Sequence, residues 1–298
     1  MTSLAIEHGV DITKERAKEK RRKFIRALFK RKIVLVSFIG VCVFILIGIF
    51  APLLAPYDIY TTSLMETLQR PSAAHLLGTD DAGRDILSRL IFGTRVSLVV
   101  GVLAVIIACC IGTFFGMLAG YSGGIVDDVI NRTSEAVRVI PQIVLAMTLT
   151  AIFGGGIISL AVVLGISNTT VYIRMMRSQV LTIRETDYIM AAVLQGNSKL
   201  KIMFRHVLPN SISPIIVIMT QQIGSTILAE AGLSFLGLGI SQPMASWGSI
   251  VSGGKDYLMT NPAFSMAPGI CIALLVIFMN ILGDGIRDVL DPRLRGDV

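Results

Sequence analysis

Charged residues are scarce in this chain. Only 16% of its 298 residues are Asp, Glu, Lys or Arg, and 53% are hydrophobic, whereas an ordinary soluble domain is about a quarter charged. Four long stretches hold no charge at all: 33–57, 96–126, 139–173 and 257–283. Each can supply the roughly 20 apolar residues of a membrane-spanning helix, and none has the polar face of a helix in a soluble protein. We therefore expect an all-α, polytopic membrane protein.

Motifs for catalysis and for cofactors are missing as well. No phosphate-binding loop occurs, because Gly253-Gly254-Lys255-Asp256 has neither the spacing nor the hydroxyl of Gly-x-x-x-x-Gly-Lys-Ser/Thr. The three histidines, His8, His75 and His206, are scattered and have no partner at metal-ligand spacing. No Ser/His/Asp set stands in a recognisable context. We expect a chain that is not an enzyme, holds no cofactor or metal, and needs another subunit for any work driven by ATP.

Six membrane spans fit the apolar stretches, at about residues 33–54, 96–120, 130–153, 157–173, 209–236 and 263–283. The stretch 139–173 has to be divided, and Gly154-Gly155-Gly156 is the natural turn between two helices. The purely apolar part of the third span is short, so this span has to begin among residues 128–138. That places Arg132, Glu135 and Arg138 near the cytoplasmic interface or facing the protein interior.

The distribution of Lys and Arg predicts the orientation. Eleven of them lie in Lys14–Lys32, before a stretch (33–55) that is too long for the core of a signal peptide and lacks an A-x-A cleavage pattern. With a cytoplasmic N-terminus, the cytoplasmic segments hold 22 Lys and Arg and the outer segments hold 5, as the positive-inside rule requires. Six spans return the C-terminus to the cytoplasm. The net charge of +7 then reflects topology and anionic lipid, with no nucleic-acid partner.

These boundaries predict five regions. They are a basic cytoplasmic tail (1–32), a first transmembrane helix (33–55), an extracytoplasmic segment (56–92), a transmembrane domain of five helices (93–287) and a cytoplasmic C-terminal tail (288–298). The second span carries small residues every four positions, at Ala104, Ala108, Gly112, Gly116 and Gly120. Such a stripe lets two helices approach closely in a membrane; packing within the chain is favoured over packing on a partner.

A structured loop is expected between the fourth and fifth spans. It has about 35 residues, 174–210, on the cytoplasmic side. Residues 184–195 are typical of a helix, Gly196 of its C-terminal cap, and Ser198 of the N-cap of a second short helix. Pro209 is tolerated in the first turn of the next span. Such a helical pair either fits a groove on another protein or is a solvated connector.

The residues of this loop resemble a known motif. The stretch Asp187-Tyr-Ile-Met-Ala-Ala-Val-Leu-Gln-Gly196, with Arg205-His-Val-Leu-Pro-Asn210 after it, is similar to the Glu-Ala-Ala…Gly…Leu-Pro loop of ABC importer permeases. It departs from the motif at Met190, where the family has Glu, and at His206, where Ile is frequent. Three further stretches resemble the C-type permease of the dipeptide/oligopeptide/nickel branch of that family: 77–89, 233–239 with Pro243 and Trp247-Gly248, and 283–293.

The resemblance implies a permease subunit of an ATP-driven importer, forming half of the translocation pathway for di- or oligopeptides in the inner (plasma) membrane of a prokaryote. The implied partners are a second permease in a heterodimer, two cytoplasmic ATP-binding subunits and an extracytoplasmic solute-binding protein, besides membrane lipid. It also implies that the loop couples to the ATPase, through Asp187, Tyr188, Ala191, Ala192, Gly196, Leu208 and Pro209.

Two alternatives stay open at this point. A nickel or metal-chelate importer of the same family is the alternative substrate. A self-sufficient channel or secondary transporter is the alternative of another class, and it predicts ionisable residues along several spans and an internal repeat.

One carboxylate lies within an expected span. Glu230 falls in the outer part of the fifth span, where a charged group is costly and for that reason a functional candidate. It either lines the translocation path, or meets the cation of a partner, or lies near the outer headgroups.

Overall fold

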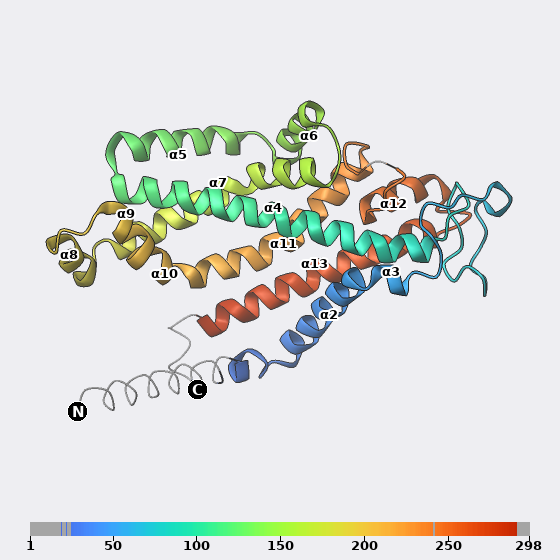
Figure 1. Ribbon diagram of the computed structural model, residues 1–298, viewed down its shortest axis with the longest axis horizontal. Coiled ribbons are helices and arrows are strands. Elements are labelled where there is room, and N and C mark those ends of the chain that lie inside the picture. The colour runs from blue at the N-terminus through green and yellow to red at the C-terminus, as the bar shows by residue number, and fades with distance from the viewer. Residues whose placement is uncertain (1–18, 20–21, 23–24, 241, 291–298) are drawn as a thin grey trace.

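The computed structural model describes residues 19, 22, 25–240 and 242–290, and this part of the chain is helical, without a β-strand (Figure 1). Most of the basic tail 1–32 and residues 291–298 of the C-terminal tail lie outside the described residues. The cytoplasmic placement of both tails therefore stays a prediction.

Within the described residues, five helices are long and apolar enough to cross a membrane: α2 (Lys32–Ile49), α4 (Ile86–Ser122), α7 (Ile157–Ile183), α11 (Ile212–Phe235) and α13 (Ala263–Leu290). They lie side by side along the long axis of the molecule (Figure 1). The predicted all-α, multi-span fold is confirmed. α4 and α7 extend well beyond their predicted apolar parts, because the segments with Arg89 and Arg95 in α4 and Arg174 and Arg177 in α7 continue the same helices.

The third predicted span, 130–153, differs from the prediction of one continuous helix. Its residues form α5 (Gly124–Val139) and α6 (Gln142–Phe153), and the two helices meet at 93°. Pro141 explains the break. Its ring excludes the helical conformation at Ile140, whose ψ is 125°. Proline also has no backbone N–H group to continue the helical hydrogen bonds. In Figure 1, α5 runs along α4 and α7, and α6 turns away from that direction.

The small-residue stripe of the second span packs within the chain, as favoured from the sequence. A Cβ placed on Gly112 would lie 2.5 Å from Cβ of Tyr172, and one on Gly116 would lie 2.6 Å from the carbonyl oxygen of Ile173. Ala104 and Ala108 are fully buried on the same helix. The backbones of α4 and α7 therefore approach so closely that the glycines leave no room for a methyl group.

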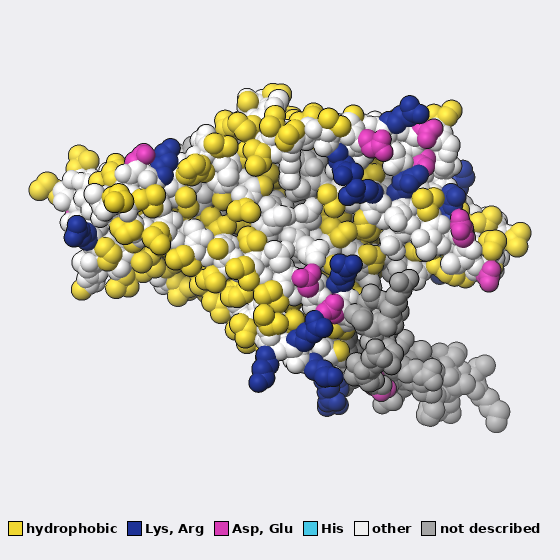
Figure 2. Space-filling view, turned by 180° about the vertical axis from the view of Figure 1, so that it is seen from behind, with side chains coloured by type: hydrophobic (Ala, Val, Ile, Leu, Met, Phe, Trp, Pro, Cys, Tyr) yellow, Lys and Arg dark blue, Asp and Glu magenta, His cyan; other side chains and the backbone are white. Residues whose placement is uncertain are grey.

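The short elements gather at the two ends of the bundle (Figure 1). One end holds α3 (Ala51–Leu54), η1 (Leu64–Glu66), the loop up to residue 85, α12 (Trp247–Gly254) and η3 (Lys255–Tyr257). The opposite end holds α8 (Asp187–Leu194), α9 (Lys199–Ile202), η2 (Met203–Val207) and α10 (Leu208–Asn210). On the face drawn in Figure 2, hydrophobic side chains extend from the left of the view across the middle, and most charged side chains lie on the right half and along the lower edge. The broad apolar surface suits a protein surrounded by lipid.

Candidate functional site

The loop between α7 and α11 is folded and not a flexible connection. α8 is terminated by Gly196, which follows its C-cap Gln195 and has a φ of +73°, a conformation that glycine adopts without strain. The amides of Gly196 and Asn197 donate to the carbonyl oxygens of Val193 (2.9 Å) and Ala192 (3.3 Å), which is the Schellman arrangement of a helix end. Ser198 Oγ then accepts a hydrogen bond from the amide of Lys201 at 3.4 Å and caps α9. Both predicted caps are confirmed.

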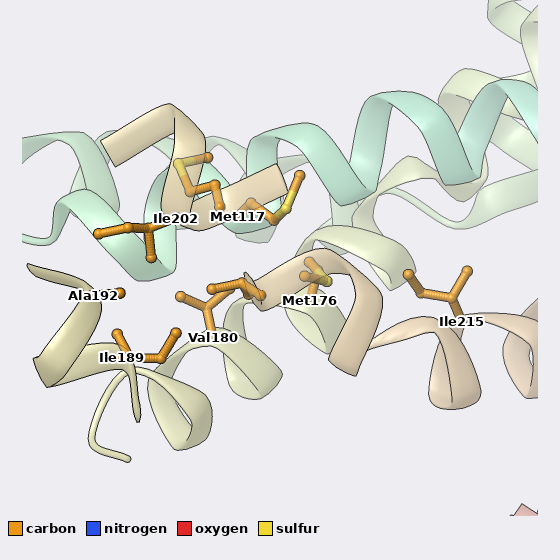
Figure 3. Close-up of a cluster of buried hydrophobic side chains, with 9 residues drawn as sticks. Met117, Met176, Val180, Ile189, Ala192, Ile202 and Ile215 are labelled. Atoms are coloured by element: carbon orange, nitrogen blue, oxygen red, sulfur yellow. The ribbon is translucent and has the colours of Figure 1, made fainter. Parts of the chain in front are cut away.

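One side of α8 is packed into the transmembrane helices. A cluster of buried hydrophobic side chains lies beneath it (Figure 3), and its members are Met117, Met176, Val180, Ile189, Ala192, Ile202, Met203, Val207 and Ile215. These residues come from α4, α7, α8, α9, η2 and α11. Because protein interiors are close-packed and barely compressible, we expect a displacement of α8 to be passed on through this shared cluster to the ends of α4, α7 and α11.

The other side of α8 is exposed and mainly apolar. Tyr188, Met190 and Ala191 are exposed, and 88% of Leu194 is accessible. An exposed apolar patch of this kind on a folded loop is typical of a surface that contacts another protein. Asp187 lies at the first position of α8 and is exposed as well.

The residues predicted to act together in this loop are divided between its two sides. Ala191 is exposed, whereas Ala192, with 5% of its surface accessible, belongs to the buried cluster. Leu208 packs partly against that cluster, and Pro209 is exposed on α10. Ala192, Leu208 and Gly196 therefore shape and support the loop, and Tyr188, Ala191 and Pro209 are available for contact. A role of these residues in coupling stays a prediction.

Glu230 is fully buried near the end of α11. Ser234 Oγ donates to its Oε1 at 2.8 Å and Ser97 Oγ to its Oε2 at 3.1 Å. The amide of Trp247 in turn donates to Ser97 Oγ at 3.3 Å. The carboxylate thus joins α11, α4 and the start of α12, an arrangement that favours a role in holding these helices together. A place on the translocation path stays a prediction.

A second buried polar cluster, which the sequence indicated only as a motif, lies at the end of the bundle that carries α12. Arg84 Nε donates to Asp80 Oδ2 at 2.7 Å, and Arg89 Nε lies 3.4 Å from the same oxygen. Arg84 Nη2 donates to Gln242 Oε1 (3.1 Å), and Arg89 Nη1 to the carbonyl oxygen of Pro243 (3.3 Å). The stretches 77–89 and 233–248 are far apart in sequence, and these contacts join them. In the sequence, the signal for such a cluster was the presence of both Asp and Arg residues within the short stretch 77–89.

Among the described residues, no group of three or more His, Cys, Asp or Glu side chains is placed to hold a metal ion.

Comparison with known proteins gives the family. Residues 112–296 match the model of the binding-protein-dependent transport system inner membrane component, and residues 21–71 match the model of the N-terminal transmembrane domain of oligopeptide transport permease C. A dipeptide transport system permease protein, DppC of Alkalihalophilus pseudofirmus, is 42% identical over 274 residues, which are 92% of this chain and 90% of that protein.

Other relatives and a solved structure agree. The glutathione transport system permease protein GsiD of Pectobacterium atrosepticum is 37% identical over 92% of this chain and 91% of its own. The oligopeptide transport system permease protein OppC of Bacillus subtilis is 34% identical over 89% and 87%. A chain of the MetNI methionine ABC transporter has the same fold, with a TM-score of 0.57 at 19% identity over 69% of this chain and 98% of that chain. This chain therefore belongs to the family of inner membrane components of binding-protein-dependent transport systems.

Proposed function

We propose that this chain forms one half of the translocation pathway of an ATP-driven importer of di- or oligopeptides, and that a second permease forms the other half. The relatives named above are permeases for dipeptides, oligopeptides and glutathione, and all of these solutes are short peptides. The names of these relatives do not support the nickel alternative. Membership of a family that works with binding proteins disfavours a self-sufficient channel or secondary transporter.

The observation that carries the proposal is the two-sided construction of α8. Its exposed side offers Tyr188, Ala191 and Leu194 to a partner, and its other side belongs to a buried cluster that also includes side chains of α4, α7 and α11. A subunit without a phosphate loop needs such a contact to receive work from an ATPase. The proposed occupant of this surface is one of two cytoplasmic ATP-binding subunits, so the end of the bundle with α8 faces the cytoplasm.

The opposite end would then face the solute-binding protein. There, residues 56–85, α12 and η3 form a folded cap whose interior holds the Asp80, Arg84 and Arg89 cluster. A cap with a rigid interior keeps its outer surface in one shape, as contact with a binding protein requires.

Reconstitution tests the proposed function. The chain is co-expressed with a candidate second permease and candidate ATP-binding subunits, purified, and placed in liposomes with the solute-binding protein. We expect uptake of a radiolabelled dipeptide that depends on ATP and on every component. Peptide flux through this chain alone, or ATP-driven uptake of Ni²⁺ without uptake of any peptide, would contradict the proposal.

A further inference from the structure

α5 exposes charged side chains along its length. Asp128, Arg132, Glu135 and Arg138 are all exposed, and their spacings of four and three residues place the first three on one stripe of the helix. We call these four residues the α5 face. Across the part of the chain that the structure describes, none of the four has an oppositely charged group within 4.0 Å.

Two sets of hydrogen bonds fix the depth of α5 in the bundle. At its start, Arg177 Nε and Nη2 on α7 donate to the two carboxylate oxygens of Asp127, each at 2.6 Å. Just beyond its end, Gln142 Nε2 donates to Asn168 Oδ1 at 2.8 Å, and Asn168 Nδ2 to Thr226 Oγ1 at 3.1 Å. Arg177 and Asn168 are separated by about 14 Å along α7, at 1.5 Å per residue.

The inner of these two contacts, at Asn168, lies at the level of the middle of the membrane. Asn168 lies beside Thr169, whose carbonyl oxygen would be 2.6 Å from a Cβ on Gly112. Gly112 is near the centre of the charge-free stretch 96–126 of α4. The α5 face therefore extends from the level of Arg177, at the end of the apolar part of α7, into the membrane interior. Four charged side chains at these depths cannot point into hydrocarbon without a large cost in free energy.

The break between α5 and α6 supports the same conclusion. Among the described residues, the first amides of α6, at 142–144, have neither a helical acceptor nor a capping side chain. Val139, next to the break, is 83% exposed. Irregular backbone at this depth is tolerated only where it is buried in protein or lines a water-filled cavity.

We infer that the α5 face and the break at 140–141 form the wall of a water-filled solute passage, in the half of the membrane nearer α8. This inference rests on the proposed function, because the opposite wall would be the second permease. The exposed charges indicate that water fills this passage. Two acidic and two basic side chains with no oppositely charged group within 4.0 Å among the described residues would need closely matched partners in a dry interface, whereas water solvates all of them. The Asp127–Arg177 and Gln142–Asn168 contacts hold this wall against α7 at its two ends.

Cysteine labelling tests the inference in the complete transporter. The complex of this chain, the second permease and the ATP-binding subunits is placed in lipid nanodiscs, with Cys42, Cys109, Cys110 and Cys271 replaced by serine. Single cysteines are introduced as Arg132→Cys, Glu135→Cys and Val139→Cys. A cationic, membrane-impermeant methanethiosulfonate is applied without nucleotide, and again with ATP and vanadate.

The chain offers depth-matched controls. Ile39 on α2 and Ile277 on α13 are 52% and 50% exposed and lie in apolar stretches. Ile277 is at the level of the break, because Val276 lies against Gly224, close to Thr226. Ile39 is at a similar level, because Gly40 lies against the ring of Phe278. We expect Arg132→Cys, Glu135→Cys and Val139→Cys to react about tenfold faster than Ile39→Cys and Ile277→Cys in at least one nucleotide state, since thiolates form in water and not in apolar surroundings.

Rates at all three positions as slow as those of the two controls, in both nucleotide states, would overturn the inference. Slow rates accompanied by disulfide cross-links to the second permease would show a dry subunit interface instead, and would overturn it too. The proposed function is measured separately, by assaying ATP-driven dipeptide uptake by the serine-substituted complex. Uptake with slow labelling would refute the passage wall alone, and absence of uptake would refute the function.

Discussion

At the scale of single residues, the contact between α4 and α7 depends on glycines that cannot be enlarged. We expect Gly116→Ala to destabilise the chain by about 1–3 kcal/mol, because its methyl group would meet the backbone of Ile173, which cannot move away as a flexible side chain can. Gly232 in α11 is the matched control, since nothing lies within 4 Å of a Cβ placed there. Gly232→Ala should be neutral or stabilise the helix by about 0.5–1 kcal/mol. Thermal unfolding of the purified chain in detergent measures both changes, and equal melting temperatures of the two variants would contradict the tight approach.

Two adjacent aspartates offer a second residue-scale comparison. Asp80 is buried and forms ion pairs with both Arg84 and Arg89, whereas the Asp81 side chain is 39% accessible and lies 3.7 Å from Arg84. We expect Asp80→Ala to cost about 3–5 kcal/mol, because it leaves buried Arg89 without its counter-charge and Arg84 with only the more distant Asp81. Asp81→Ala should cost at most about 1 kcal/mol, as is usual for an exposed ion pair.

Limited proteolysis of the outer segment 56–85 measures this difference. The segment of the Asp80→Ala variant should be cut much faster than that of the unmodified chain, and the segment of Asp81→Ala at nearly the normal rate. Equal protection of the two variants would show that the cluster does not stabilise the cap.

At the scale of the element, the two sides of α8 should respond differently to the same substitution. Ala191→Arg places a large charge on the exposed side, and we expect an intact permease pair that binds the ATP-binding subunits about 2–5 kcal/mol more weakly, the cost of a charge buried without a partner. Ala192→Arg forces the same charge into the cluster around Ile189 and Met176, so this variant should lower the melting temperature of the chain itself.

Co-purification of the ATP-binding subunits and the melting temperature of the chain separate these effects. Normal association and normal transport by the Ala191→Arg variant would show that α8 is not the coupling contact. A normal melting temperature for Ala192→Arg would show that its side chain is not buried in solution.

Local signals predicted the short elements well. Gly196 and Ser198 mark the end of α8 and the start of α9 because capping depends only on a few neighbouring residues. The sequence could not tell which side of α8 is buried, since Ala191 and Ala192 are identical side chains and only the packing of distant helices separates them. The 93° bend at Pro141 was missed for a related reason. A charge-free stretch such as 139–173 predicts how much apolar chain is available to span a membrane, but not the direction of the helix axis. Trp247–Gly254 was not predicted as a helix, although Ser246 and Ser249 form a capping box there.

The Asp80, Arg84 and Arg89 cluster was predicted only as a resemblance in the sequence 77–89. Its counterparts, Gln242 and the carbonyl oxygen of Pro243, come from a loop more than 150 residues later. No periodicity or spacing joins two such segments. Glu230 was correctly singled out as unusual, but its partners Ser97 and Trp247 likewise come from other parts of the chain.

At the scale of the whole molecule, the orientation rests on the asymmetry of 22 against 5 Lys and Arg. Ser198 and Lys255 are exposed at opposite ends of the bundle. With the native cysteines replaced, Ser198→Cys should react with an impermeant thiol reagent only after the cells are lysed, whereas Lys255→Cys should react in intact spheroplasts. The reverse pattern would invert the topology and place α8 on the outer side, out of reach of an ATPase.

The close approach of α4 and α7 has a mechanical consequence. Because the glycines of this contact admit no methyl group, sliding or rotation of one helix past the other would cause clashes, and we expect the pair to move as a single rigid body. α4 has 37 residues, a length of about 55 Å at 1.5 Å per residue. One end of this body meets α8 through Met117, Met176 and Val180, and the other carries Arg89. We therefore expect a tilt imposed at α8 to displace the cap at the opposite end of the bundle.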